Sequence, residues 1–158
     1  MALDRSRRRS RLSPMATRPS ESKRALAADV WRRLFDFFIS TSRQRQRVLA
    51  ELDLTPNDSR ALHTLDPREG RTMRSLADEW GCDASNATWI VDRLEARGLA
   101  ERRAQAGDRR VKLVVLTTTG VKTRDRLREA MYEPPPELLA LPSTTLQALK
   151  AASAKLPK

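Results

Sequence analysis

Residues 72–120 read TMRSLADEWGCDASNATWIVDRLEARGLAERRAQAGDRRVKLVVLTTTG, and this stretch decides the fold. Its first part has apolar residues at the spacing of a helix with one buried face: Leu76, Ala77 and Trp80. Gly81 favours the left-handed turn that ends such a helix. Asp83 suits the N-cap of a second helix over residues 84–97. Two helices joined by a turn of about three or four residues predict a helix-turn-helix.

The second helix has two kinds of face. Its apolar residues recur on one side, which predicts burial: Ala87, Ile90, Val91 and Leu94. Other side chains point elsewhere: Ser85, Asn86, Thr88, Trp89, Asp92 and Arg93. Trp89 is unusual at such a position. It either contacts DNA, on a sugar or a thymine methyl, or folds back to line a pocket, or packs against the core.

A two-stranded hairpin is expected directly after these helices. Residues 99–103 and 111–117 favour strands. The tip between them contains turn residues and arginines: Gly107, Asp108, Arg109 and Arg110. A positive side chain at an exposed tip suits the negative potential of a narrow minor groove. The stretch therefore predicts one helix for the major groove of a DNA duplex and one loop for the minor groove.

Two spaced motifs in this stretch resemble the MarR (multiple antibiotic resistance regulator) family. One is a wing pattern, Asp-x-Arg followed by a strand ending in Leu-Thr and then Gly: Asp108, Arg110, Leu116, Thr117 and Gly120. The other is Val-Asp-x-Leu-x-x-x-Gly-Leu: Val91, Asp92, Leu94, Gly98 and Leu99. Several motifs in the right order make the resemblance specific, and it covers about residues 54–120. It implies a winged helix-turn-helix, dimers whose first and last helices intertwine, and regulation by small, often aromatic or phenolic molecules.

The expected fold class is therefore mainly α with a small β-hairpin wing: a winged helix-turn-helix domain with N- and C-terminal dimerisation helices. This domain would span residues 23–158. The DNA-binding lobe would lie at about residues 54–120, between dimerisation helices at about 23–47 and 121–156. Leu146, Leu149 and Leu156 near the C-terminus have a spacing close to that of a helical seam.

The predicted DNA contacts fall into three groups. In the major groove, bases or phosphates would meet Ser85, Asn86, Thr88 and Trp89. Phosphates, which set register rather than sequence choice, would meet Arg93, Arg97, Arg102 and Arg103, although each of these arginines has a solvated surface as its alternative. The resemblance further implies that Asp108 braces Arg110 and that Arg110, beside Arg109, enters the minor groove.

The first long helix is expected to begin near residue 22 and to run to about residue 43 or beyond. Its apolar residues follow the helical period: Leu26, Val30, Leu34, Phe37 and Phe38, with Trp31 and Phe35 beside them. Core packing is one interpretation. The other is a face that meets a second subunit or lines a small-molecule pocket. Candidates for that pocket are Trp31, Phe35 and Trp89, which the sequence alone does not place together.

The charge of the chain points to a polyanionic partner. The 158 residues carry a net charge of +11 and a pI of about 11.1, which favours nucleic acid or an acidic membrane surface. Residues 1–22, with six arginines, predict a disordered basic arm. This arm is either a phosphate-seeking segment, a solvated tail, or a mis-assigned start upstream of Met15.

The same composition argues against other classes of protein. One histidine and one cysteine leave few nucleophile–base pairs, and no phosphate loop or metal-ligand motif occurs. We therefore expect no enzyme, no metal and no cofactor. No run approaches the 18 or so apolar residues of a spanning helix, and the N-terminus lacks the apolar stretch of a signal peptide, so we expect a cytoplasmic protein without membrane contact. Cys82 is expected to be a small apolar residue rather than an oxidation sensor.

The sequence thus predicts a sequence-specific DNA-binding transcriptional regulator with double-stranded DNA and a second copy of itself as partners. We expect a dimeric repressor that a small aromatic or phenolic effector releases from a pseudo-palindromic operator. The alternative is an activator, or a constitutive architectural DNA-binding protein without ligand control.

Overall fold

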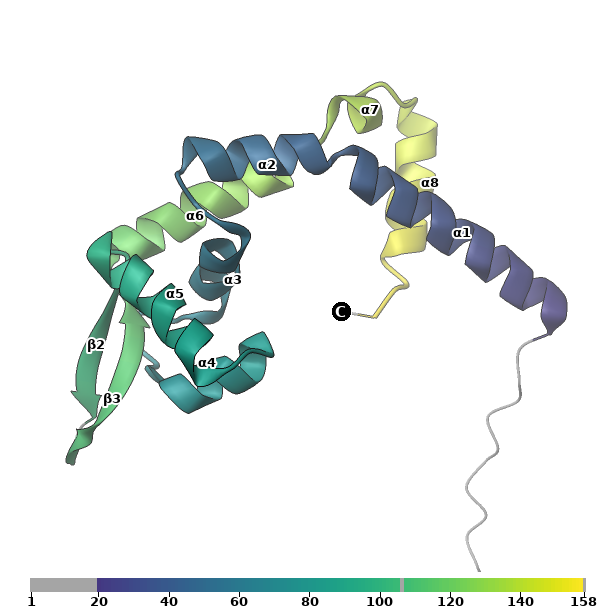
Figure 1. The fold of residues 1–158 in the computed structure, drawn as a ribbon. Coiled ribbons are helices and arrows are strands. Elements are labelled where there is room, and N and C mark those ends of the chain that lie inside the picture. Colours follow the sequence, from purple (N-terminus) through teal and green to yellow (C-terminus); the bar gives the residue numbers. More distant parts are fainter. Residues whose placement is uncertain (1–19, 106, 158) are drawn as a thin grey trace, which may run out of the picture. The chain divides into compact units, whose positions relative to one another are not determined.

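The computed structural model of the chain describes residues 20–105 and 107–157. The chain divides into two compact units, Met1–Ser40 and Thr41–Lys158. The predicted basic arm, residues 1–22, lies outside the described residues except for its last three. In the first unit the described element is α1 (Glu21–Ser40). The second unit contains the remaining elements (Figure 1): α2 (Ser42–Glu51), α3 (Pro56–Thr64), β1 (Arg71–Thr72), α4 (Met73–Trp80), α5 (Ala84–Ala96), β2 (Ala100–Gln105), β3 (Asp108–Leu116), α6 (Thr118–Tyr132), α7 (Pro136–Leu139) and α8 (Ser143–Ser153).

The long N-terminal helix ends earlier than its apolar period predicts. α1 stops at Ser40 and α2 begins at Ser42, with Thr41 between them at φ −84° and ψ 4°. The Ser40 hydroxyl donates to the carbonyl oxygen of Phe37 at 2.9 Å. Serine and threonine side chains compete in this way for backbone groups, so the Ser-Thr-Ser run provides a local reason for the break.

α1 is amphipathic, and within the described residues of its unit its apolar face is uncovered. None of its 20 residues is buried. Seven large apolar side chains on it are between 48% and 67% exposed: Leu26, Val30, Trp31, Leu34, Phe35, Phe38 and Ile39. Within the described residues of its own unit, α1 therefore has no core to pack against.

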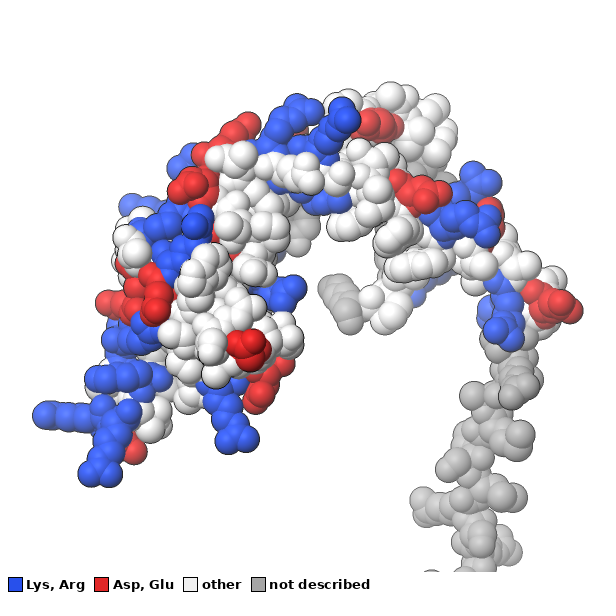
Figure 2. Space-filling model, viewed as in Figure 1, with Lys and Arg blue, Asp and Glu red and all other residues white. Residues whose placement is uncertain are grey.

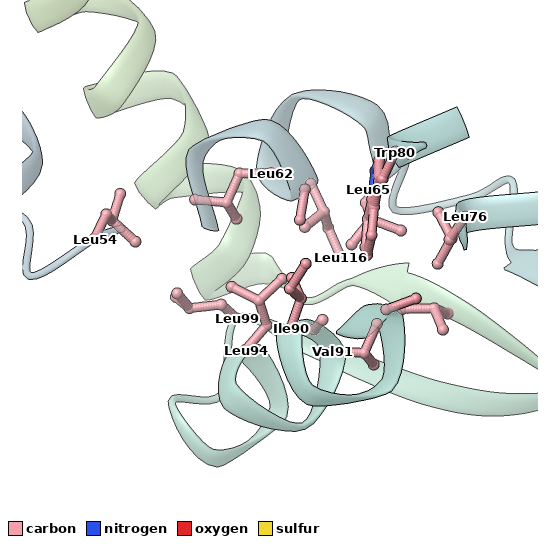
Figure 3. Packing of buried hydrophobic residues seen from close by; sticks show 14 of the residues in the cluster. Leu54, Leu62, Leu65, Leu76, Trp80, Ile90, Val91, Leu94, Leu99 and Leu116 are labelled. Atoms are coloured by element: carbon pink, nitrogen blue, oxygen red, sulfur yellow. The ribbon is translucent and has the colours of Figure 1, made fainter. Parts of the chain in front are cut away.

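The second unit is built on one hydrophobic cluster, to which α2–α6 and the sheet contribute (Figure 3). Its largest fully buried apolar side chains come from distant parts of the sequence: Leu62, Leu65, Leu76, Leu94, Leu116 and Leu127. α3 enters this core at a fixed angle, because the Thr55 hydroxyl accepts from the Asp58 N–H at 3.1 Å and the Asp58 carboxylate accepts from the Thr55 N–H at 2.8 Å. This is a capping box with Pro56 at the first helical position.

The wing is a three-stranded antiparallel sheet in the order β1-β3-β2, one strand more than predicted. The Asp66 carboxylate accepts from the N–H groups of Glu69 and Arg68, which holds the pKa of Asp66 below its usual value. The resulting turn brings Gly70 against the side chain of Leu113, where a Cβ would clash. A residue without a side chain at position 70 thus allows β1 to pair with β3.

The β2–β3 hairpin is longer than expected. The strands extend to Gln105 and resume at Asp108, so Arg109 and Arg110 lie in β3 and not in a seven-residue loop. Gly107 turns the chain at φ 88°. The register shifts between Ala104 and Gln105, and such an irregularity increases the local twist of a hairpin.

Two hydrogen bonds of the Thr117 side chain connect the wing to α6. The Thr117 hydroxyl donates to the carbonyl oxygen of Gly98 at 2.6 Å and accepts from the N–H of Gly120 at 2.9 Å. A Cβ at position 120 would collide with the carbonyl oxygen of Leu99, which explains why the motif requires glycine there. α6 then runs to Tyr132, shortly before the three prolines at residues 134–136. No helix of the described residues is long and apolar enough to span a bilayer.

Candidate nucleic-acid interface

The helix-turn-helix consists of α4 and α5, and each boundary has an identifiable cause. The Thr72 hydroxyl caps α4 by accepting from the N–H of Ser75 at 3.2 Å. Gly81 ends α4 in the left-handed region at φ 61°. The Asp83 carboxylate caps α5 by accepting from the N–H of Asn86 at 2.7 Å. The end of α4 at Gly81 and the start of α5 after Asp83 lie where the sequence predicts them, so the start of α5 is fixed against α4.

α5 buries the predicted face: Ala87, Ile90, Val91 and Leu94 are 0–3% exposed. The predicted contacts Ser85, Asn86 and Thr88 are exposed on its other sides. The Thr88 hydroxyl donates to the carbonyl oxygen of Ala84 at 2.7 Å, within its own helix. Trp89 is 55% exposed, so the interpretation that it packs against the core is wrong.

The tip of the wing carries free positive charge. Arg109 and Arg110 are exposed, and neither forms an ion pair with a described residue. The Asp108 carboxylate accepts from the backbone N–H of Arg110 at 2.9 Å. It therefore braces the strand and leaves the guanidinium group free. Figure 2 shows Lys and Arg side chains gathered at the outer end of the β2–β3 hairpin.

Arg93 on α5 has an internal partner. Its Nε donates to the Asp58 carboxylate at 2.9 Å, and the exposed fractions of the two side chains are 33% and 0%. The other carboxylate oxygen of Asp58, Oδ1, is buried without a hydrogen bond to any described residue. This pair ties α5 to α3 across the core. The sequence places Asp58 in the first turn of α3 but gives no sign of its burial or of its partner.

Two further predicted phosphate contacts are also held by the protein. Arg97 donates to the carbonyl oxygens of Leu52 and Asp53 at the end of α2, the former at 3.0 Å. Arg102 forms ion pairs with Asp92 at 2.8 Å and with Glu95, both on α5. Unpaired carbonyl groups at a helix end gain from a cation, and Arg102 neutralises two carboxylates of α5 that face β2. Both arginines thus have structural roles that the sequence does not reveal.

Arg103 lies between these two groups. It is paired with Glu101, its neighbour on the same face of β2, but the exposed fractions of the two side chains are 56% and 44%. A pair this exposed is weak, so Arg103 can exchange its partner. Two free cations that the predictions leave out are Arg74 on α4 and Lys112 on β3, both exposed and without an ion pair to any described residue. In the sequence, only the positive charge of these two residues indicates a role in DNA binding.

Comparison with known proteins shows which family this region resembles. The model of the MarR family matches residues 52–111, which include α3, the helix-turn-helix and most of the wing. Residues 52–111 of the chain thus form a region of the MarR family type. Proteins of the MarR family are DNA-binding transcriptional regulators and are not enzymes. The resemblance inferred from the sequence motifs is confirmed.

Solved structures agree with the fold. A mutant of S. aureus MepR bound to an oligodeoxyribonucleotide is 23% identical, with 79% of this chain and 94% of that chain covered and a TM-score of 0.66. The YusO protein from Bacillus subtilis is 21% identical, with 87% and 96% covered and a TM-score of 0.69. Wild-type MarR from E. coli is 24% identical, with 80% and 96% covered and a TM-score of 0.61. Curated protein sequences give no significant match.

These likenesses confirm the predicted MarR-like winged helix-turn-helix with N- and C-terminal helices. The division at Ser40 and Thr41 falls inside the first predicted dimerisation helix, residues 23–47. The dimerising role of the flanking helices and the DNA contacts of the individual residues stay predictions.

The predicted effector pocket of Trp31, Phe35 and Trp89 stays a prediction. The rings of Trp31 and Phe35 lie together on α1, with centroids 6.2 Å apart. Trp89 belongs to the other unit. Within that unit a separate groove of about 360 Å³ lies between α2 and α6. Cys82 is partly buried and packs against the core cluster, as expected of a small apolar residue.

Proposed function

We propose that the protein is a homodimeric repressor that binds a pseudo-palindromic operator and leaves it when a small aromatic or phenolic effector binds. The observation that carries the DNA-binding part is the free charge of the wing: Arg109 and Arg110 are exposed and unpaired in the described chain, next to an α5 whose outward side chains reach solvent. Each subunit lays α5 in a major groove and the wing tip in the adjacent minor groove.

The uncovered face of α1 supports the dimer. A helix with seven large apolar side chains about half exposed or more gains stability when a second copy covers it, since apolar burial contributes about 25 cal/mol per Å². The ring pair Trp31 and Phe35 on the same helix offers apolar surface to an aromatic effector.

Selection of binding sites from random duplexes with the full-length protein tests the proposal. We expect an enriched sequence with two inverted half-sites about one helical turn apart and a light-scattering mass of two chains. A reporter behind that operator should be silent until a simple phenol or aromatic acid is added. Enrichment of a single isolated half-site, or a monomer in solution, would refute the dimer. If the protein increases expression of the reporter, it is an activator. If no aromatic compound changes the expression, it is a constitutive DNA-binding protein.

A further inference from the structure

The centre of the outward face of α5 is aromatic. With 3.6 residues per turn, Ser85, Trp89 and Ala96 lie opposite the buried stripe. Trp89 is 55% exposed, and its indole makes no hydrogen bond or ring contact with a described residue. A tryptophan is rarely left this open without a partner, because its large apolar surface costs free energy in water.

The polar neighbours of Trp89 are occupied. The Thr88 hydroxyl donates to the carbonyl oxygen of Ala84 at 2.7 Å, and the Asp92 carboxylate is paired with Arg102 at 2.8 Å. The centre of this face thus offers an indole ring with one N–H donor and, one turn earlier, the small hydroxyl of Ser85. Such a surface can recognise an apolar group with a hydrogen-bond acceptor beside it.

One base presents that combination in the major groove. Thymine shows a C5-methyl group and the acceptor O4, whereas cytosine shows the donor N4–H₂ and no methyl. The indole of tryptophan is a donor and not an acceptor, so it pairs with O4 and not with N4. Sugars and phosphates do not distinguish these bases.

We infer that Trp89 is a specificity-determining residue of α5 and that it selects a thymine in each half-site through the C5-methyl group and O4. The inference rests on the proposed placement of α5 in the major groove and adds the chemistry by which that helix chooses a base. Asn86, on the flank of the same face, remains available for a different base.

Uracil scanning of the selected operator tests this contact with the full-length protein. Each thymine is replaced by deoxyuridine, which removes one methyl group, symmetrically in both half-sites. Burial of one methyl group is worth about 0.8 kcal/mol, or about fourfold in affinity. We expect one position per half-site at which uracil weakens wild-type binding by roughly this factor per half-site, and no such effect in Trp89→Ala. Trp89→Phe should keep the methyl effect, because an aromatic ring remains.

Ser85→Ala is the matched control. It removes a hydroxyl group from the same face but no apolar surface. Whatever its effect on overall affinity, the ratio between the affinities for thymine and uracil operators should stay at the wild-type value. Urea unfolding of Trp89→Ala checks that the variant is folded under the conditions of the binding assay. The inference is overturned if Trp89→Ala weakens thymine and uracil operators equally, which indicates a sugar contact. It is also overturned if Trp89→Ala leaves affinity unchanged, or if the operator contains no thymine that Trp89 senses. If no sequence is enriched at all, the proposed function fails first.

Discussion

The arginines of the DNA-binding lobe fall into two groups that composition does not distinguish. The tethered arginines, Arg93, Arg97 and Arg102, hold α5 to α3, to the end of α2 and to β2. The wing-tip arginines, Arg109 and Arg110, have no ion pair in the described chain. A tethered arginine has already exchanged water for a protein partner, whereas a free one makes that exchange when DNA arrives. The net charge of the chain therefore does not show which of its arginines are available to bind DNA.

The buried Asp58 provides the strongest test of this difference. Arg93→Ala removes the cation beside a carboxylate that is 0% exposed. Breaking a buried pair from one side leaves an uncompensated charge. We expect a loss of about 3 kcal/mol in the free energy of unfolding, near the low end of the usual range because Arg93 itself is one third exposed. Urea unfolding monitored by circular dichroism measures it.

The double variant Asp58→Asn/Arg93→Ala tests whether the buried charge causes this loss. The amide oxygen of the introduced asparagine still accepts from the Thr55 N–H, and no charge is left buried. The double variant should therefore be more stable than Arg93→Ala alone. If Arg93→Ala unfolds at the wild-type urea concentration but binds the operator weakly, Arg93 contacts DNA like the wing-tip arginines and does not hold α5 to α3.

The wing tip should behave in the opposite way. Arg110→Ala removes an exposed cation without an internal ion pair, so stability should not change. Its affinity for the selected operator should fall by about 1–3 kcal/mol, measured by fluorescence anisotropy at fixed salt. Asp108→Ala should lower the affinity for the operator by less than Arg110→Ala does, because it releases the strand beneath Arg110 but keeps the cation.

Arg68→Ala is the control of equal charge. Arg68 lies in the turn that joins α3 to β1, and this turn contacts the Leu116 end of β3, opposite the tip. Both substitutions lower the net charge by one. An equal loss of affinity in Arg68→Ala and Arg110→Ala would mean that total charge matters and that the tip has no special role.

The division between these groups marks the limit of what the sequence predicts. Caps and turns such as Asp83 and Gly81 depend on neighbours in the chain, so the helix-turn-helix is predictable from local pattern and its boundaries are confirmed. The strand β1 is only two residues long and exists through its register with Val114 and Leu113. No local signal precedes it.

The tethered arginines could not be assigned for a similar reason. The partners of Arg93 and Arg97 are 35 and 44–45 residues away along the chain, and nothing in the pattern around an arginine shows which carboxylate or carbonyl will face it. The sequence places Asp58 in the first turn of α3, where an acidic residue is favourable, but its burial arises from the packing of α5 on α3. Trp89 shows the same limit, because only the fold decides that its indole lies on the open side of α5.

The smallest expected effect concerns Arg103, which stands between the two groups. Its pair with Glu101 is exposed, so Arg103→Ala should leave the free energy of unfolding unchanged. We expect Arg103 to act with the wing-tip arginines as a phosphate contact. The slope of log K against log salt should then decrease by about one per subunit, uniformly across operator sequences.

Glu101→Gln separates this contact from the ion pair. It frees Arg103 from its carboxylate, so the salt slope should stay at the wild-type value while affinity rises slightly for every duplex. An unchanged slope in Arg103→Ala would instead place Arg103 with the tethered arginines, despite its exposure. In that case solvent exposure alone could not identify the arginines that meet DNA, and freedom from an internal partner would be the property that decides.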